Sequence, residues 1–338
     1  MSRLRVGVIG AGAWGKNHVR TLAAMADADL AVVCDASAAI RERIARQHPG
    51  VTVTDAPADL LRAVDAVVIA SPAPTHAGLA LQAVEAGIPA LVEKPFALTT
   101  ADAVRMAEAA ERAGVPVLVG HLLVHHPIVQ RLHAMLHDGS LGEPYYLYSQ
   151  RLNLGQVRPD ENALWSLGPH DVSVALHLLG ETPVRVAANG QAWLQPGVED
   201  VVFLVMHFAS GVVAHAHLSW LDPHKERRLT VVGSRQMAVF DDMAPREKLR
   251  VYDKGVDRRE AFLSAAESLQ LREGDIHIPL VGGGEPLGLE LAHFVRVARG
   301  APVEMTGAAD GVAVVRVLEA ASRSLRAGGQ PVNVENGG

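Results

Sequence analysis

The sequence predicts an α/β protein of two domains: a Rossmann-type, doubly wound parallel sheet followed by an α+β domain with a large, mostly antiparallel sheet. Residues 4–120 alternate short apolar runs with amphipathic segments of helical length, which is typical of βαβ units. After residue 120, strand-length runs follow one another with only turns between them. The length of 338 residues also exceeds what one hydrophobic core usually organises.

The first domain is expected to span residues 1–121. Its strands are apolar throughout, as in parallel sheets that are covered by helices on both faces. Right-handed crossovers between such strands give the doubly wound arrangement. The predicted strands are Leu4–Ile9, Leu30–Cys34, Val51–Val53, Ala66–Ala70, Ala90–Val92 and Val117–Val119.

The second domain is expected to span residues 122–330, with a frayed end beyond it. Turns at Gly211 and Gly233 separate neighbouring runs, as in an antiparallel sheet. Its helices are expected near residues 122–137, 165–179, 287–299 and 311–327. Its strands are expected near Pro144–Asn153, Val184–Trp193, Val201–Phe208, Val212–Ser219, Arg228–Val232 and Ala238–Phe240.

Composition excludes several classes of function. Although 49% of the residues are hydrophobic, no apolar stretch reaches the roughly 18 residues of a membrane-spanning helix. The interrupted N-terminus is unlike a signal peptide, and the single cysteine, Cys34, allows no internal disulfide. We therefore expect a soluble, cytoplasmic protein with a buried thiol. A net charge of -6 excludes general attraction to nucleic acid or anionic membranes.

A glycine-rich loop follows the first predicted strand and precedes a helix. In it, Gly10 permits a tight turn, Gly12 lets backbone N–H groups approach a pyrophosphate, and Gly15 allows close packing of helix and strand. Ala13 and Trp14 complete the loop. The pattern predicts a dinucleotide site; the alternative is an ordinary glycine-rich turn.

Asp35 ends the second predicted strand, 20 residues after Gly15. A carboxylate there accepts hydrogen bonds from a ribose diol and repels a 2′-phosphate, so we expect NAD rather than NADP. Asp35 also suits a helix N-cap. Arg41 and Arg43 are expected to lie too far along the next helix to reverse this preference.

Ser71 and Pro72 follow the fourth predicted strand, and His76 comes soon after. Ligands bind at the carboxyl edge of doubly wound sheets, so these residues are further candidates for cofactor binding. Taken alone, the segment is only a turn and a helix cap.

Glu93-Lys94-Pro95 follows the fifth predicted strand. Together with the glycine loop and Asp35, this tripeptide resembles the Gfo/Idh/MocA family of sugar and inositol dehydrogenases over essentially the whole chain. The resemblance implies that Lys94 lies beside the nicotinamide and is catalytic, that Glu93 also binds the cofactor, and that the proline, often cis in the family, shapes the turn. An ammonium group there would stabilise a developing alkoxide. The alternative for any lysine is an ordinary surface position.

A later segment contains Arg151, Asn153, Arg158, Asp160, Asn162, Trp165 and Pro169-His170-Asp171. This set resembles the nucleotide-sugar branch of the family, which oxidises the 3-hydroxyl of UDP-N-acetylglucosaminuronate (UDP-GlcNAcA) on a route to surface polysaccharides. The resemblance implies that His170 is the catalytic histidine, and histidine is a residue type that suits a general base. A buried structural histidine is the alternative.

Ser166 stands where many inositol-dehydrogenase-like members carry an aspartate, one helical turn before the histidine. The change puts a carboxylate–histidine relay in doubt. Asp171 is about 100° round the helix from His170 and cannot be assumed to replace it.

Arg151, Asn153, Arg158 and Asn162 offer donors for a diphosphate or a uronate carboxylate, since arginine binds either with two parallel hydrogen bonds. With Trp165, they form the predicted substrate set. Alternatively, the strand residues face solvent and Arg158 pairs with Asp160.

Histidine pairs suggest a metal, but no HExxH motif or cysteine cluster accompanies them, and hydride transfer needs none. We therefore expect no metal, although His121 could line the substrate pocket. The pairs are His121/His125, His133/His137 and His215/His217. Near the closing helices, Glu285-Pro286-Leu287 with Glu290 indicates only a helix start.

The sequence and the resemblance together predict NAD-dependent oxidation of a secondary hydroxyl, at C3, of a nucleotide-linked sugar, with UDP-N-acetylglucosaminuronate as the first candidate. Two alternatives stay open: a dehydrogenase or ketoreductase of a free sugar, inositol or another nucleotide sugar, and a non-catalytic nucleotide-sensing regulator. The apolar runs Val201–Val205 and Val212–Ala214 favour a sheet face covered by a second copy, so a homodimer or homotetramer is expected.

Overall fold

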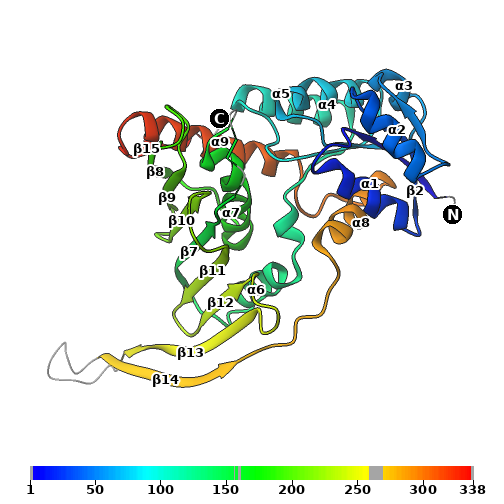
Figure 1. The fold of residues 1–338 in the computed structure, drawn as a ribbon. Coiled ribbons are helices and arrows are strands. Elements are labelled where there is room, and N and C mark those ends of the chain that lie inside the picture. Colours follow the sequence, from blue (N-terminus) through cyan, green and yellow to red (C-terminus); the bar gives the residue numbers. More distant parts are fainter. Residues whose placement is uncertain (1–2, 156, 159–160, 259–268, 336–338) are drawn as a thin grey trace. The chain divides into compact units, whose positions relative to one another are not determined.

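The computed structural model describes residues 3–155, 157–158, 161–258 and 269–335, and the chain divides into two compact units (Figure 1). Unit 1 consists of residues 1–125 and 284–316, and unit 2 of residues 126–283 and 317–338. Each unit is built on a sheet whose strands all come from that unit.

Unit 1 contains a six-stranded parallel sheet with the order β3-β2-β1-β4-β5-β6. The order reverses between β1 and β4, which is where ligands bind in doubly wound sheets. The parallel sheet predicted from the apolar runs is therefore confirmed. The strands are β1 (Leu4–Ile9), β2 (Ala28–Cys34), β3 (Thr52–Thr54), β4 (Ala66–Ile69), β5 (Ala90–Val92) and β6 (Val117–Val119).

Local signals set the ends of several helices in unit 1. The Ser37 hydroxyl accepts a hydrogen bond from the N–H of Ile40 at the start of α2, and Thr99 caps α5 in the same way. Gly114 ends α5 with a left-handed φ of 63°. The helices are α1 (Gly15–Ala24), α2 (Ala38–Gln47), α3 (Pro57–Leu61), α4 (His76–Glu85) and α5 (Thr100–Ala113), with short 3₁₀ turns η1 (Ala73–Thr75) and η2 (Leu122–His125).

Helix α8 (Pro286–Ala298), from late in the chain, completes unit 1. It contacts α1 and η2, and Leu287, Leu291 and Phe294 are buried in the core that also contains β1. This packing differs from the expected second domain of residues 122–330, which includes α8. The spacing of apolar residues shows that α8 has a buried face, but it does not show which sheet covers that face.

Unit 2 contains a nine-stranded sheet with the order β14-β13-β12-β11-β7-β10-β9-β8-β15. Strands β7 and β10 are parallel, and the other neighbouring pairs are antiparallel. The large, mostly antiparallel sheet expected from the sequence is thus confirmed. The strands are β7 (Pro144–Leu152), β8 (Arg185–Gln191), β9 (Val201–His207), β10 (Val213–Ser219), β11 (Glu226–Gly233), β12 (Met237–Asp241), β13 (Leu249–Arg258), β14 (Leu269–His277) and β15 (Val332–Asn333).

The long hairpin of β13 and β14, which extends from the edge of this sheet (Figure 1), is not among the strands expected from the sequence. Its side chains do not alternate clearly between buried and exposed positions; Leu271, for example, is exposed. Leu249 and Val251 at the start of β13 are buried, but the other described side chains of the hairpin lack the apolar alternation that makes a strand visible in a sequence.

The chain end also differs from the frayed segment that was expected. Val332 pairs with Val186 of β8, and the following Val334 is buried. Residues 336–338, at the very end, lie outside the described residues.

The helices of unit 2 are α6 (Pro127–His137), α7 (Ala163–Leu179) and the C-terminal part of α9 (Ala308–Arg326). The helix expected over 122–137 is interrupted, because η2 ends at His125 and α6 begins at Pro127. Proline has no N–H and suits the first position of a helix. The ring of His126 caps this start, since its Nδ1 accepts a hydrogen bond from the N–H of Ile128 at 3.1 Å.

Helix α7 covers one face of the unit 2 sheet, over β10, β7 and β9. Side chains alternate between the two faces of a strand, and the other face presents the exposed rings of Tyr146, Tyr148 and Phe203. The Phe203 ring lies 4.4 Å from the ring of His217, between centroids, so this histidine packs as part of an aromatic surface. The homo-oligomer expected through this sheet stays a prediction.

No helix in the described part of the chain is long and apolar enough to cross a membrane. Cys34 is a buried thiol at the end of β2. Burial raises its pKa to about 11, with a further contribution from the charge of Asp35.

Candidate active site

Two of the loop glycines are required by close backbone contacts. Gly10 has a φ of +89°, and a Cβ there would lie 2.6 Å from the backbone nitrogen of Ser71. A Cβ on Gly15 would lie 1.9 Å from the carbonyl oxygen of Gly10. Helix α1 can therefore begin this close to β1 only if both positions lack a side chain.

Gly12 differs, because a Cβ built there meets no atom within 4 Å. The N–H groups of Gly12 and Ala13 make no hydrogen bond within the described part of the chain. Space beside the loop and unused donors at the start of α1 are what a pyrophosphate requires. The residues present thus fit a dinucleotide cofactor.

Asp35 lies directly beside this loop. One carboxylate oxygen accepts a hydrogen bond from the N–H of Ala11 at 2.8 Å, and the other accepts one from the N–H of Ser37 at 2.9 Å. The side chain therefore shapes the loop, and each oxygen still has a lone pair for a ribose hydroxyl.

Arg41 and Arg43, expected nearby but too far along α2 to reverse the preference for NAD, both extend back to the loop. Arg41 donates to the carbonyl oxygen of Asp35 at 2.7 Å, and Arg43 donates to that of Ala11 at 2.8 Å. Helix α2 starts only a few residues after Asp35, so long side chains in its first two turns can extend back to the loop. Two guanidinium groups thus lie at the nucleotide end of the site, and the preference for NAD over NADP stays a prediction.

The segment after β4 is tied to the segment after β5 by a buried histidine. The two ring nitrogens of His76 each lie 2.9 Å from a carbonyl oxygen, those of Ser71 and Pro95. The Ser71 hydroxyl is 2.6 Å from that of Thr75, and Pro72 precedes η1. His76 therefore connects the two segments, after β4 and after β5, that border the predicted cofactor site.

Glu93 is a buried hub between the glycine loop and the predicted catalytic lysine. Its Oε1 lies 2.7 Å from His18 Nε2 and accepts a hydrogen bond from the Trp14 indole, while Oε2 accepts one from the N–H of Lys94 at 3.0 Å. Burial alone would raise the pKa of Glu93, but the hydrogen bond from His18 and the charges of His18 and Lys94 lower it. The carboxylate therefore stays ionised. The Lys94–Pro95 peptide bond is cis.

Two further buried groups face the charge of Glu93. Burial lowers the pKa of His121 to about 4, so its ring is neutral at physiological pH. Glu290 of α8 is fully buried, and neither carboxyl oxygen has a hydrogen-bond partner among the described residues. Burial, and then the charge of Glu93, raise the pKa of Glu290 well above its ordinary value, which favours the protonated acid.

Sequence reasoning missed the buried position of Glu290. A signal was present, since Glu290 lies between Leu287, Leu291 and Phe294 on the apolar face of α8. At positions i−3, i+1 and i+4, these neighbours indicate burial of that face.

In unit 2, the start of α7 is held by two residues that were predicted to bind substrate. Asn162 accepts a hydrogen bond from the N–H of Trp165 at 3.1 Å and donates to Glu199 at 2.6 Å. The Trp165 indole donates to the Ser322 hydroxyl at 3.0 Å. Both side chains therefore anchor the helix that carries His170, which is partly buried.

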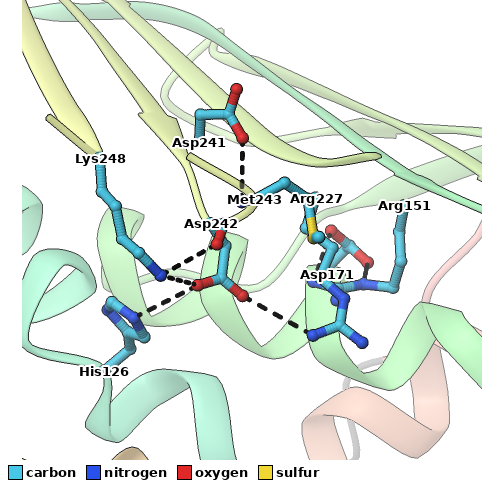
Figure 2. Close-up of polar contacts among 8 residues, drawn as sticks. All are labelled: His126, Arg151, Asp171, Arg227, Asp241, Asp242, Met243 and Lys248. Carbon is cyan, nitrogen blue, oxygen red and sulfur yellow. Dashed lines mark hydrogen bonds and ion pairs between the residues drawn. The ribbon is translucent and has the colours of Figure 1, made fainter. Parts of the chain in front are cut away.

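Arg151 and Asp171 form an ion pair between β7 and α7 (Figure 2). The Nε and Nη2 atoms of Arg151 lie 2.6 and 3.4 Å from the two carboxylate oxygens of Asp171. The pair has little exposure, with side chains 13% and 5% accessible. The carboxylate next to His170 in sequence is thus engaged by an arginine, while position 166 is a buried serine.

The other predicted substrate residues lie at the ends of neighbouring segments. The backbone N–H of Asn153 donates to the carbonyl of Ser219, which extends the pairing beyond β7. Arg158 forms an ion pair with Glu161 at 2.7 Å, whereas Asp160, the partner suggested by the sequence, lies outside the described residues.

Each unit thus assembles its own share of the predicted residues. In unit 1, the glycine loop, Asp35, Ser71 and Lys94 lie at the carboxyl ends of β1, β2, β4 and β5. In unit 2, the candidates lie at the end of β7 and along α7. Within the residues that the structure describes, no group of three or more His, Cys, Asp or Glu side chains could hold a metal ion.

Models of two domain families match the chain. Residues 4–121 match the oxidoreductase family with an NAD-binding Rossmann fold, and residues 129–239 match the GFO/IDH/MocA C-terminal domain.

Named relatives include two types of sugar dehydrogenase. UDP-N-acetylglucosamine 3-dehydrogenase of Acidithiobacillus ferrooxidans is 31% identical over 75% of this chain and 79% of that protein. Inositol 2-dehydrogenase 2 of Saccharopolyspora erythraea is 34% identical over 64% of this chain and 66% of that protein, slightly less than two thirds of its length. The crystal structure of GenD2 from gentamicin A biosynthesis, in complex with NAD, has a TM-score of 0.81 at 27% identity and covers 99% of this chain and 97% of that one.

Proposed function

Because this chain belongs to the Gfo/Idh/MocA oxidoreductase family, we propose that it is an NAD(H)-dependent dehydrogenase of a nucleotide-linked sugar. The first candidate substrate is UDP-N-acetylglucosaminuronate, oxidised at its 3-hydroxyl. The relative named UDP-N-acetylglucosamine 3-dehydrogenase supports the nucleotide sugar and the position of oxidation. The proposal that the sugar carries a carboxylate rests on the segment from Arg151 to Asp171, which resembles the nucleotide-sugar branch of the family.

The buried Glu93 carboxylate is the observation that carries the proposal of a dehydrogenase. It receives hydrogen bonds from Trp14 in the glycine loop and from the backbone of Lys94, and it contacts His18 of α1. One ionised side chain therefore couples the cofactor loop to the lysine that would meet the reacting hydroxyl. Contacts of this kind, made to the residues around a catalytic group, restrict that group to its productive position.

Gly12 and Ala13 would hold the cofactor's pyrophosphate through their backbone N–H groups, and Asp35 would accept hydrogen bonds from its adenosine ribose. When bound, the nicotinamide accepts a hydride from the carbon of the secondary alcohol. The protein must supply the accompanying acid–base chemistry.

We assign the removal of the hydroxyl proton to His170 and the stabilisation of the developing alkoxide to the ammonium group of Lys94. The uncharged ring of His121 is better suited to hydrogen bonding with the substrate than to acting as a second base. Because Arg151 holds both oxygens of Asp171, we assign no relay carboxylate to that residue.

A second candidate is a dehydrogenase of a free polyol, which the similarity to an inositol 2-dehydrogenase supports at 34% identity. The alternative of a regulator without turnover predicts binding of nucleotide and sugar but no hydride transfer. These possibilities differ in one assay.

The test measures NADH formation with NAD and a matched panel of UDP-N-acetylglucosaminuronate, UDP-N-acetylglucosamine, myo-inositol and glucose. We expect the highest kcat/KM with the acidic UDP-sugar, and a large loss of kcat in His170→Ala with little change in the Kd of NADH. Turnover of myo-inositol alone would favour the second candidate. Binding without turnover of any panel member would favour the regulator.

A further inference from the structure

We propose that Arg227, which the sequence analysis did not select, binds an oxyanion group of the substrate in unit 2. The proposal rests on the proposed function, because it names the residue that binds a negatively charged group of a nucleotide-linked sugar. The oxyanion is either the carboxylate of the sugar or its diphosphate, which offer the same planar pairs of acceptor oxygens to a guanidinium.

The register of the sheet places Arg227 beside Arg151. Arg227 in β11 is directly opposite Arg151 in the antiparallel neighbour β7, and residues opposite one another project from the same face. Arg151 contacts Asp171 of α7, so this is the face that α7 covers. Figure 2 shows the two arginine side chains extending toward the same region.

The two arginines differ in how fully their charges are paired. Both oxygens of the buried Asp171 contact Arg151. Arg227 is 46% exposed, and its one ion pair within the described residues, with Asp242, spans 3.7 Å. The N–H groups of Arg227 are thus still available for a stronger, charge-assisted hydrogen bond.

Asp242 is itself neutralised by another residue. Lys248 Nζ lies 2.9 Å from its carboxylate and 2.9 Å from its backbone carbonyl oxygen. Burial opposes ionisation of Asp242, but the hydrogen bond and charge of Lys248 lower its pKa. His126 Nε2 is 3.8 Å away, and burial lowers the pKa of this histidine, which favours its neutral form.

The cluster therefore has an excess of positive charge. Arg151, Arg227 and Lys248 are cations, whereas Asp171 and Asp242 are the two carboxylates that pair with them. Detaching Arg151 to bind substrate would leave the buried Asp171 charge without its cation, which is costly. Arg227 can take an anion at much lower cost, because it gives up only a long, partly exposed contact.

The test compares Arg227→Gln with Arg228→Gln. Arg228 is the next residue of β11, so it projects from the opposite face; it is similarly exposed (43%) and also pairs with an aspartate, Asp241. The dissociation constants of UDP-N-acetylglucosaminuronate and UDP-N-acetylglucosamine are measured by calorimetry in the presence of NADH. Arg227→Lys is a second variant, which keeps the charge but loses the fork of two parallel donors.

We expect Arg227→Gln to weaken binding of the acidic UDP-sugar by roughly 10- to 100-fold, as for a lost charge-assisted hydrogen bond. Arg227→Lys should be intermediate, and Arg228→Gln should stay within about twofold of wild type. A loss confined to the acidic sugar assigns the carboxylate to Arg227, whereas equal losses with both sugars assign the diphosphate. Equal effects of Arg227→Gln and Arg228→Gln would overturn the proposal.

The same variants separate this proposal from the proposed function. If wild-type protein binds neither UDP-sugar, the proposed substrate class is wrong, and pyrophosphate and glucuronate then serve as anion probes in thermal-shift measurements. Arg227 is supported if one of these probes raises the Tm of wild type and of Arg228→Gln but not that of Arg227→Gln. It is excluded if neither probe distinguishes the two variants.

Discussion

Replacing Glu290 by glutamine should change how the stability of the protein depends on pH. The carboxyl group is fully buried without a hydrogen-bond partner among the described residues, and its pKa is raised by burial and by the charge of Glu93. The unfolded chain releases this proton above the ordinary value of 4.5, whereas the folded chain retains it. Wild-type stability should therefore fall as the pH rises from 4.5 toward the folded-state pKa.

The magnitude follows from the linkage of one proton to unfolding. Within that pH window, each pH unit removes about 1.4 kcal/mol from the free energy of unfolding of wild type but not from that of Glu290→Gln. The free-energy difference between the two proteins should therefore increase with pH by the same amount. Glu290→Met should show the same slope with a further gain of roughly 1–3 kcal/mol, because it also removes unpartnered polar atoms.

The assay is urea denaturation of each protein from about pH 5 to about pH 8, with the difference from wild type plotted against pH. Glu285→Gln is the matched control, since Glu285 borders the same helix but is 55% exposed and pairs with Arg20 on the surface. That control should change stability by less than about 1 kcal/mol, without a pH-dependent difference. Parallel pH profiles for wild type and Glu290→Gln would refute the assignment of a buried, protonated acid.

Three further predictions concern the cofactor and the chemistry. Gly15→Ala should lower the Tm, because its Cβ would meet a backbone oxygen at 1.9 Å. Gly12→Ala should leave the Tm of the cofactor-free protein unchanged but weaken NADH binding measured by calorimetry. Equal Tm losses in the two variants would contradict this prediction. Asp35→Ser should weaken NAD binding by roughly 1.5–3 kcal/mol and reduce the discrimination against NADP in competition assays. Equal affinity of the wild type for both cofactors would count against the role of Asp35. In steady-state kinetics, His170→Ala should reduce kcat by about 10²- to 10⁴-fold. The double variant with Lys94→Ala should lose less kcat than the product of the two single losses, because both residues serve one proton transfer. A loss of only about threefold in His170→Ala would exclude the assignment of His170 as the base.

Much of unit 1 could be predicted because its signals are local. The apolar runs of β1 and β5 indicate strands without any knowledge of their neighbours, and the spacing of Gly10 and Gly15 indicates a strand–turn–helix junction. Asp35 could be predicted beside the loop because the carboxyl ends of adjacent parallel strands lie at one edge.

Other features required the arrangement of distant segments. Arg41 and Arg43 extend back to the loop by side-chain rotamers that a helical periodicity does not specify. Asn162 has donors that suit a ligand, yet it caps α7 and binds Glu199. The same polar atoms serve substrate binding or folding, and the partner within reach decides which.

The sequence by itself determined the strands of the parallel sheet, β7 to β12 of the large sheet, the glycine loop and the tripeptide ending at Pro95, because backbone conformation depends mainly on nearby residues. The tertiary structure decided which charges are neutralised. Glu290 is far from Glu93 in sequence, yet burial in one core makes it respond to that charge, and Arg227 became a candidate only through its register opposite Arg151. Electrostatic energies depend on the distance between charges in space, and the distance between remote residues cannot be read along the chain.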